Sequence, residues 1–170
     1  ELQRRFASVQ RINFDALLLT ELRAQAQAMK VDWAVVLQAD AAERTSRHWT
    51  NLQRLVQRTL PALRTALLHS HQPILLVCAG LLARYGLMHL VTELEEHAGR
   101  PGHTPSAWLL LPTSAQGLPT IDGVAVPLVN NINNTRALAL PQAWVENKHR
   151  AKTGPHTASP AGSYASPFAA

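Results

Sequence analysis

Residues 73–112 hold the pattern that most constrains what this chain can fold into. The run Ile74–Cys78 is apolar at every position and lies between Pro73 and Gly80, which is typical of a strand buried on both faces. A second apolar run, at 107–112, predicts another buried strand. Between them a helical stripe recurs at three- and four-residue spacing: Leu81, Tyr85, Met88, Val91, Leu94 and Ala98. Strand, helix and strand in this order predict a parallel pair joined by a right-handed crossover.

The first seventy residues read mostly as helix. Apolar positions recur at helical spacing over 1–30, with Asn13 as an N-cap, so we expect one long helix or two helices separated near Asn13. Residues 31–40 fit a helix or a short strand, and the balance favours a helix. Residues 46–70 carry the clearest helical stripe, capped by Ser46, and Pro61 should kink this helix or end its first half.

The last third of the chain is rich in turn residues. Residues 118–129 predict a hairpin with Asp122-Gly123 as its turn, and the flanking prolines confine its strands to an edge. Residues 140–150 predict a short helix, and the Pro-rich stretch 151–170 a disordered tail. We therefore predict an α/β fold: a helical N-terminal part packed on a small mixed sheet, made of a parallel β-α-β unit and an edge hairpin. The expected segments are 1–30, helical; 31–150, the α/β domain; and 151–170, the tail.

Composition and charge indicate the cellular compartment of the protein and the kinds of partner it could bind. The chain has 170 residues, and 16 Lys and Arg against 11 Asp and Glu give a net charge of +5. The basic residues are dispersed, which favours a solvated surface, with nucleic-acid contact as a weaker alternative. A single cysteine allows no internal disulfide and fits a reducing compartment, so we expect a cytoplasmic protein. No apolar run reaches about 18 residues, so no membrane span is expected. Because the chain starts at Glu1, we expect the last piece of a longer polypeptide.

The turn after the first buried strand is the candidate ligand site. It holds one glycine and lacks the Lys and Ser or Thr of a phosphate loop, so a tight turn explains Gly80 better than phosphate binding does. Arg84 and Tyr85 follow within the next helical turn, where open α/β sheets place ligands. Gly80, Arg84 and Tyr85 are therefore the candidate ligand-binding residues. The alternative is that Arg84 pairs with a surface carboxylate and that Tyr85 packs in the core.

The sequence offers no catalytic residue and no metal ligand set. The eight histidines do not follow a zinc-binding spacing, and solvent-exposed histidines are the expectation. Cys78 lies in an apolar run, which predicts a buried structural thiol rather than a nucleophile. We therefore expect no cofactor in this segment.

Four phrases give the chain a resemblance to a known family. They are "LLARYG" at 81–86, "WLLLP" at 108–112, "PTIDGVAVPL" at 119–128 and "PQAWVENKHR" at 141–150. Over roughly 30–150 the chain resembles the C-terminal region of the multidomain serine/threonine kinases of phage growth limitation (BREX-type) systems, or of a neighbouring phage-defence ATPase. Residues 129–140, "VNNINNTRALAL", depart from that pattern.

The resemblance implies an antiviral role, an intracellular location and an ATP-using enzyme upstream. No catalytic residue carries over, because the His-Arg-Asp, Asp-Phe-Gly and glycine-rich motifs of kinases are absent from this sequence. The first hypothesis is an accessory module that binds a protein partner or an upstream domain. The alternatives are a small-ligand or nucleotide-sensing domain and a nucleic-acid-contacting module.

Overall fold

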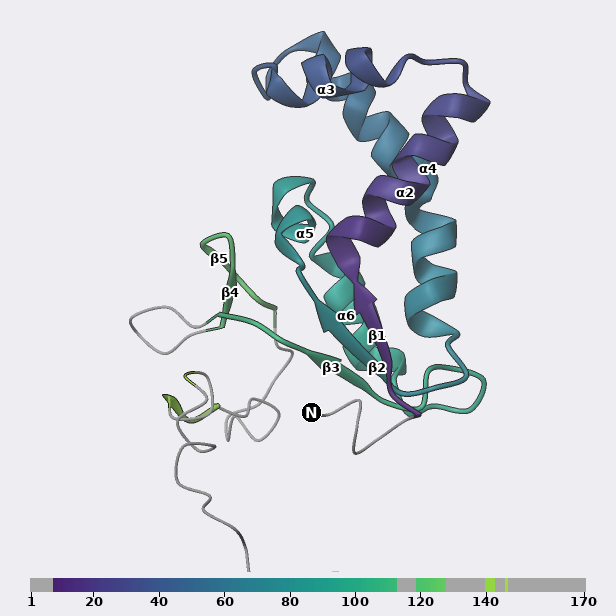
Figure 1. Cartoon of the computed structure of the whole chain (residues 1–170), viewed down its shortest axis with the longest axis vertical. Coiled ribbons are helices and arrows are strands. Elements are labelled where there is room, and N and C mark those ends of the chain that lie inside the picture. The colour runs from purple at the N-terminus through teal and green to yellow at the C-terminus, as the bar shows by residue number, and fades with distance from the viewer. Residues whose placement is uncertain (1–7, 113–118, 128–139, 143–145, 147–170) are drawn as a thin grey trace, which may run out of the picture. The chain divides into compact units, whose positions relative to one another are not determined.

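The computed structural model describes residues 8–112, 119–127, 140–142 and 146 (Figure 1). Contacts divide the chain into two units, Glu1–Asn130 and Asn131–Ala170. The first unit holds every strand and helix named below. The expected helix at 140–150 lies mostly outside the described residues, and the expected tail at 151–170 lies entirely outside them. None of the described helices is long and apolar enough to cross a lipid bilayer.

Three parallel strands form the sheet of the first unit: β1 (Gln10–Asn13), β2 (Ile74–Val77) and β3 (Ala107–Leu109), in the order β1-β2-β3. The register places Ile12 beside Leu76 and Leu76 beside Leu109. The predicted parallel β-α-β unit at 73–112 is confirmed. The helix expected across 10–13 is wrong, because these residues pair with β2. A four-residue strand with one buried side chain, Ile12, is too short for its alternation to be visible in the sequence.

Three helices connect β1 to β2: α2 (Phe14–Ala28), α3 (Trp33–Ala41) and α4 (Arg47–Leu68). Each begins after a residue whose side chain accepts a hydrogen bond from a backbone N–H of the first turn, and these N-caps are Asn13, Asp32 and Ser46. The helix favoured over 31–40 and the cap predicted at Ser46 are confirmed. The helix α4 does not end at Pro61, because its buried stripe continues on both sides of the proline.

Two short helices connect β2 to β3: α5 (Gly80–Arg84) and α6 (His89–His97). The single helical stripe expected over 81–98 is therefore broken. Gly86 adopts a φ of +69°, a left-handed conformation that glycine reaches at little cost, and it ends the first helix. Leu87 then donates from its backbone N–H to the carbonyl of Leu82. Leu82 and Leu87 are both fully buried, so the break keeps the apolar positions facing the core.

The predicted hairpin is confirmed at β4 (Thr120–Ile121) and β5 (Val124–Ala125). Asp122 and Gly123 have φ angles of +46° and +77°, as a type I′ turn requires. The hairpin forms a two-stranded sheet of its own and does not join the three parallel strands. Ile121 and Val126 nevertheless belong to the main hydrophobic core.

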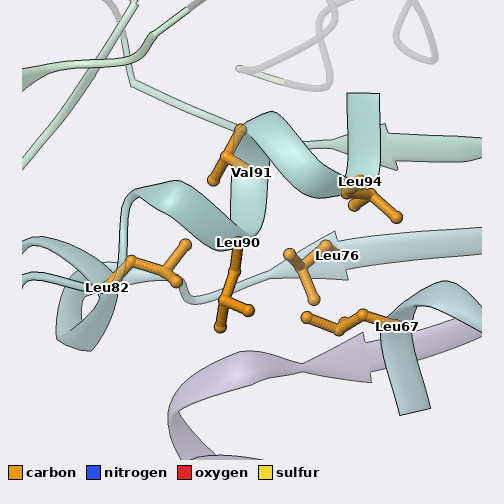
Figure 2. A pocket seen from close by; sticks show the side chains of 6 residues that line it. All are labelled: Leu67, Leu76, Leu82, Leu90, Val91 and Leu94. Carbon is orange, nitrogen blue, oxygen red and sulfur yellow. The ribbon is translucent and has the colours of Figure 1, made fainter. Parts of the chain in front are cut away.

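The core lies on one face of the parallel sheet. Figure 2 shows Leu76 of β2 directed toward Leu67 of α4 and toward Leu90 and Leu94 of α6. Leu82 and Val91 complete the lining of this space, which does not admit a water molecule. These apolar side chains are packed against one another and leave no room for a ligand.

Candidate functional site at the carboxyl edge of the parallel sheet

The ends of β1 and β2 are tied together by hydrogen bonds. The backbone N–H of Asp15 donates to the carbonyl of Cys78 at 3.0 Å, and the Asp15 carboxylate accepts from the backbone N–H of Leu81 at 2.9 Å. Asp15 is in the first turn of α2, and Leu81 is in the first turn of α5. This carboxylate therefore joins the two helices that begin at the carboxyl edge of the sheet, where open α/β sheets bind ligands.

Gly80 lies against two carboxylates. A methyl group at Gly80 would be 3.1 Å from Oδ2 of Asp122 and 3.6 Å from Oδ2 of Asp15. Partial burial raises the pKa of Asp15, and the neighbouring charge of Asp122 adds to that rise, whereas the hydrogen bond from Leu81 opposes it. The turn thus presents negative charge, which is unfavourable to a phosphate and favourable to a cation. No group of three or more ligating side chains suited to a metal occurs in the described part of the chain.

Cys78 differs from the expectation of a buried strand thiol. It follows the last residue of β2, is exposed, and adopts a φ of +51°. The left-handed conformation that the turn needs therefore falls on Cys78, two residues before Gly80. The sequence suggested Gly80 for this role because glycine is the usual residue in such turns.

Arg84 and Tyr85 both bind Asp40 of α3. Arg84 donates from Nε to Oδ1 of Asp40 at 2.9 Å, and its Nη2 lies 2.9 Å from Oδ2. The Tyr85 hydroxyl donates to the same Oδ1 at 2.9 Å. The ring of Tyr85 stacks on Trp49 with centroids 6.0 Å apart. These contacts fasten α5 to α3 and α4, and they match the alternative in which Arg84 pairs with a carboxylate and Tyr85 packs.

The three candidate ligand-binding residues lie at the two ends of α5. Gly80 faces Asp15 and Asp122, whereas Arg84 and Tyr85 face Asp40. A ligand that used Arg84 would have to displace Asp40 from the guanidinium. Ligand binding at these residues stays a prediction.

Sequence reasoning missed Asp15 and Asp40. The sequence predicted a helix where β1 lies, so it did not place Asp15 directly after the end of a strand. Asp40 lies 44 residues from Arg84, and nothing local in the sequence joins them.

Three histidines lie close together near the amino ends of the strands, opposite the carboxyl edge. The ring of His103 lies 5.0 Å from that of His69 and 4.8 Å from that of His97, measured between centroids. His103 Nδ1 is buried without a hydrogen-bond partner among the described residues. A shallow, solvent-open depression of about 420 Å³ borders this cluster. Its lining residues are Gln10, Thr65, Ala66, His69, Ser70, His71 and Gln72.

Comparison with known proteins gives one informative similarity. No protein-family model matches the chain, and no solved structure matches it. The chain is 29% identical over 155 residues to "Probable kinase PglW" of Streptomyces coelicolor. The match covers 83% of this chain and 10% of that protein, so the chain spans about a tenth of the length of the relative it matches.

Proposed function

We propose that this chain is a cytoplasmic, non-catalytic, partner-binding module of a phage-defence protein akin to the phage growth limitation kinases. The similarity to "Probable kinase PglW" carries the proposal, because it extends over 83% of this chain and only a tenth of the relative. A match of that proportion is what one module of a larger protein would give. The phrases "LLARYG", "WLLLP" and "PTIDGVAVPL" support the same relationship.

The chemistry of the described residues agrees with a non-catalytic role. The sequence holds none of the motifs in which kinases keep their catalytic Asp, their Mg²⁺-binding Asp and their phosphate-covering glycines. At the carboxyl edge of the sheet, Asp15 and Asp122 flank the turn at Gly80, and they repel the phosphates of a nucleotide. Partner binding is therefore favoured over nucleotide sensing.

A phage challenge of the host that encodes this chain tests the proposal. Leu63 in α4 is fully buried, so Leu63→Asp should unfold the module. Gln57 is exposed on the same helix, so Gln57→Asp is the matched control. We expect Leu63→Asp to raise phage plating efficiency and Gln57→Asp to leave it unchanged. Equal plating in both variants would contradict the defence role, and ATP-dependent phosphate transfer by the purified chain would contradict the non-catalytic role.

A further inference from the structure

The parallel sheet carries its helices on one face. Ile12, Leu76 and Leu109 form a row across the three strands, and all three belong to the core or pack against it. Leu76 contacts the space bounded by α4, α5 and α6, as Figure 2 shows. Both helical connections, β1 to β2 and β2 to β3, therefore cover the same side. The strand order is β1-β2-β3, so both connections step toward the same edge of the sheet. Right-handed crossovers that step in the same direction place their helices on the same face.

The next row lies on the other face. Arg11, Leu75 and Trp108 are register partners across β1, β2 and β3. Leu110 continues the ladder beyond β3, since its N–H donates to the carbonyl of Leu76. Trp108 is 48% exposed and Leu110 is 51% exposed, and neither packs against the core. We call these four residues (Arg11, Leu75, Trp108 and Leu110) the outer face.

Val9 and Val77, on the same side of the sheet, are buried, whereas Trp108 and Leu110 are about half exposed and none of the described helices covers them. Such exposure is unusual for a parallel sheet. Parallel sheets occur almost only with both faces covered, and helices are the usual cover. The sequence around Trp108 is that of a strand covered on both faces, because its side chains are apolar on both sides. Leu109 and Leu111 face the core, and Trp108 and Leu110 face outward. Trp and Arg are also the residue types that dominate binding energy at interfaces.

We infer that the outer face binds an amphipathic helix of a partner protein, one with an apolar stripe over Leu75, Trp108 and Leu110 and an acidic residue opposite Arg11. This inference rests on the proposed partner-binding role. Arg11 is exposed, and its guanidinium makes no ion pair or hydrogen bond within the described residues. A carboxylate on the partner helix would supply one.

Charge favours a partner helix over two other possible occupants of the outer face, the chain's own C-terminal segment and a second copy of the chain. Residues 128–170 of the chain contain four Lys and Arg and a single acidic residue, Glu146, so they complement Arg11 poorly. A second copy carries the same net charge of +5 and would bring another Arg11 to the interface. An acidic helix from a partner would cover the apolar side chains and would pair with Arg11, which has no ion pair among the described residues.

A peptide titration of the full chain, followed by NMR, tests this inference. The probe is a synthetic helix of about 18 residues, or five turns, with leucines at i, i+3, i+4 and i+7 and glutamates beside the stripe. Its control peptide has lysines in place of the glutamates. The indole N–H signal of Trp108, assigned by its loss in Trp108→Phe, reports binding. We expect saturable shifts, with at least tenfold weaker binding of the lysine peptide.

Variants assign the binding to the outer face. Leu110→Ser should weaken binding of the acidic peptide at least tenfold, and Arg11→Glu should reverse the preference between the two peptides. Val124→Ser is the matched control, because Val124 is 45% exposed on the separate hairpin and should leave binding unchanged.

Four results would overturn the inference. They are no shift of the Trp108 signal at millimolar peptide, equal affinity for the two peptides, a dimer that Trp108→Ser dissociates, and nuclear Overhauser contacts from Trp108 to residues 128–170. The third would assign the face to a second copy, and the fourth to the chain's own C-terminal segment. None of the four alters the phage challenge with Leu63→Asp, so failure here is distinguishable from failure of the proposed function.

Discussion

Thr104 links the loop before β3 to the end of α4, and its substitution tests how much this link stabilises the fold. Its side chain is fully buried, although it lies in the loop between α6 and β3. The hydroxyl donates to the carbonyl of Leu67 at 2.6 Å and accepts from the N–H of Ser70 at 3.0 Å. Leu67 is in the last turn of α4, and Ser70 follows the C-cap residue His69. Carbonyls of the last helical turn lack partners within the helix. Thr104 therefore acts as a cap supplied by a distant segment.

Thr104→Val removes this cap and keeps the shape of the side chain. Leu67 is 1% exposed, so its carbonyl would lose its hydroxyl partner in a place that water does not reach. Two lost hydrogen bonds, one leaving a buried acceptor unsatisfied, should cost about 2–3 kcal/mol. For a chain of this size the midpoint of thermal unfolding should fall by about 5–10 °C.

Urea unfolding of the purified chain, monitored by circular dichroism, measures the effect. Thr104→Ser is the matched control, because it keeps both hydrogen bonds and loses one methyl group, at a cost of about 1 kcal/mol. The urea dependence of the unfolding free energy should stay constant across the three proteins. A Val variant as stable as the Ser variant would refute the reasoning, since burial of the methyl groups would then explain Thr104 without its hydroxyl.

Three further substitutions test the carboxyl edge of the sheet and its neighbours. Cys78→Gly should stabilise the chain by about 0.5–1 kcal/mol in urea unfolding, because Cys78 is exposed and has a φ of +51°. Asp122→Asn should lower the pKa of Asp15 in an NMR titration, because it removes the neighbouring charge that adds to the effect of burial. It should also stabilise the hairpin by about 0.5 kcal/mol, since Asn-Gly favours a type I′ turn. Burial, with a smaller contribution from Asp40, raises the pKa of Tyr85 from 10.0 to about 12, so the folded state holds this proton more tightly than the unfolded state. This contribution to the free energy of unfolding is complete below pH 10 and is lost as the pH rises to about 12. Tyr85→Phe should therefore lose less stability than the wild type between these pH values, when the free energy of unfolding is measured at each pH.

The elements that the sequence predicted well have strong local signals. Ser46 and Asn13 cap helices whose apolar stripes are long, and Asp122-Gly123 is the preferred pair for a two-residue hairpin turn. The parallel β-α-β unit follows from two fully apolar runs on either side of a helical stretch. In each case the residues that determine the local structure lie within a few positions of one another.

The elements that the sequence missed depend on distant partners. The strand β1 exists because Gln10–Asn13 pairs with Ile74–Val77, more than sixty residues further along the chain. Thr104 and Asp40 are placed by contacts with α4 and α5, and no spacing rule joins them to those helices. The helical stripe over 81–98 was correct for Tyr85, Val91 and Leu94, which are buried. It missed Leu82, Leu87 and Leu90, which are buried more deeply, because Gly86 divides the segment into two helices. The candidate site was therefore seen through Gly80, Arg84 and Tyr85 and without the carboxylates that face them.

We have proposed that this chain belongs to a phage-defence protein and binds a partner through the outer face of its sheet. The most direct measurement is phage plating efficiency on the host that encodes the chain, with Trp108→Ser compared with Val124→Ser. The two residues are 48% and 45% exposed, so neither substitution should change the unfolding midpoint much. We predict that Trp108→Ser raises plating efficiency as strongly as Leu63→Asp does, while Val124→Ser keeps wild-type restriction. Full restriction in the Trp108→Ser host, with the protein present at the wild-type level, would contradict the claim.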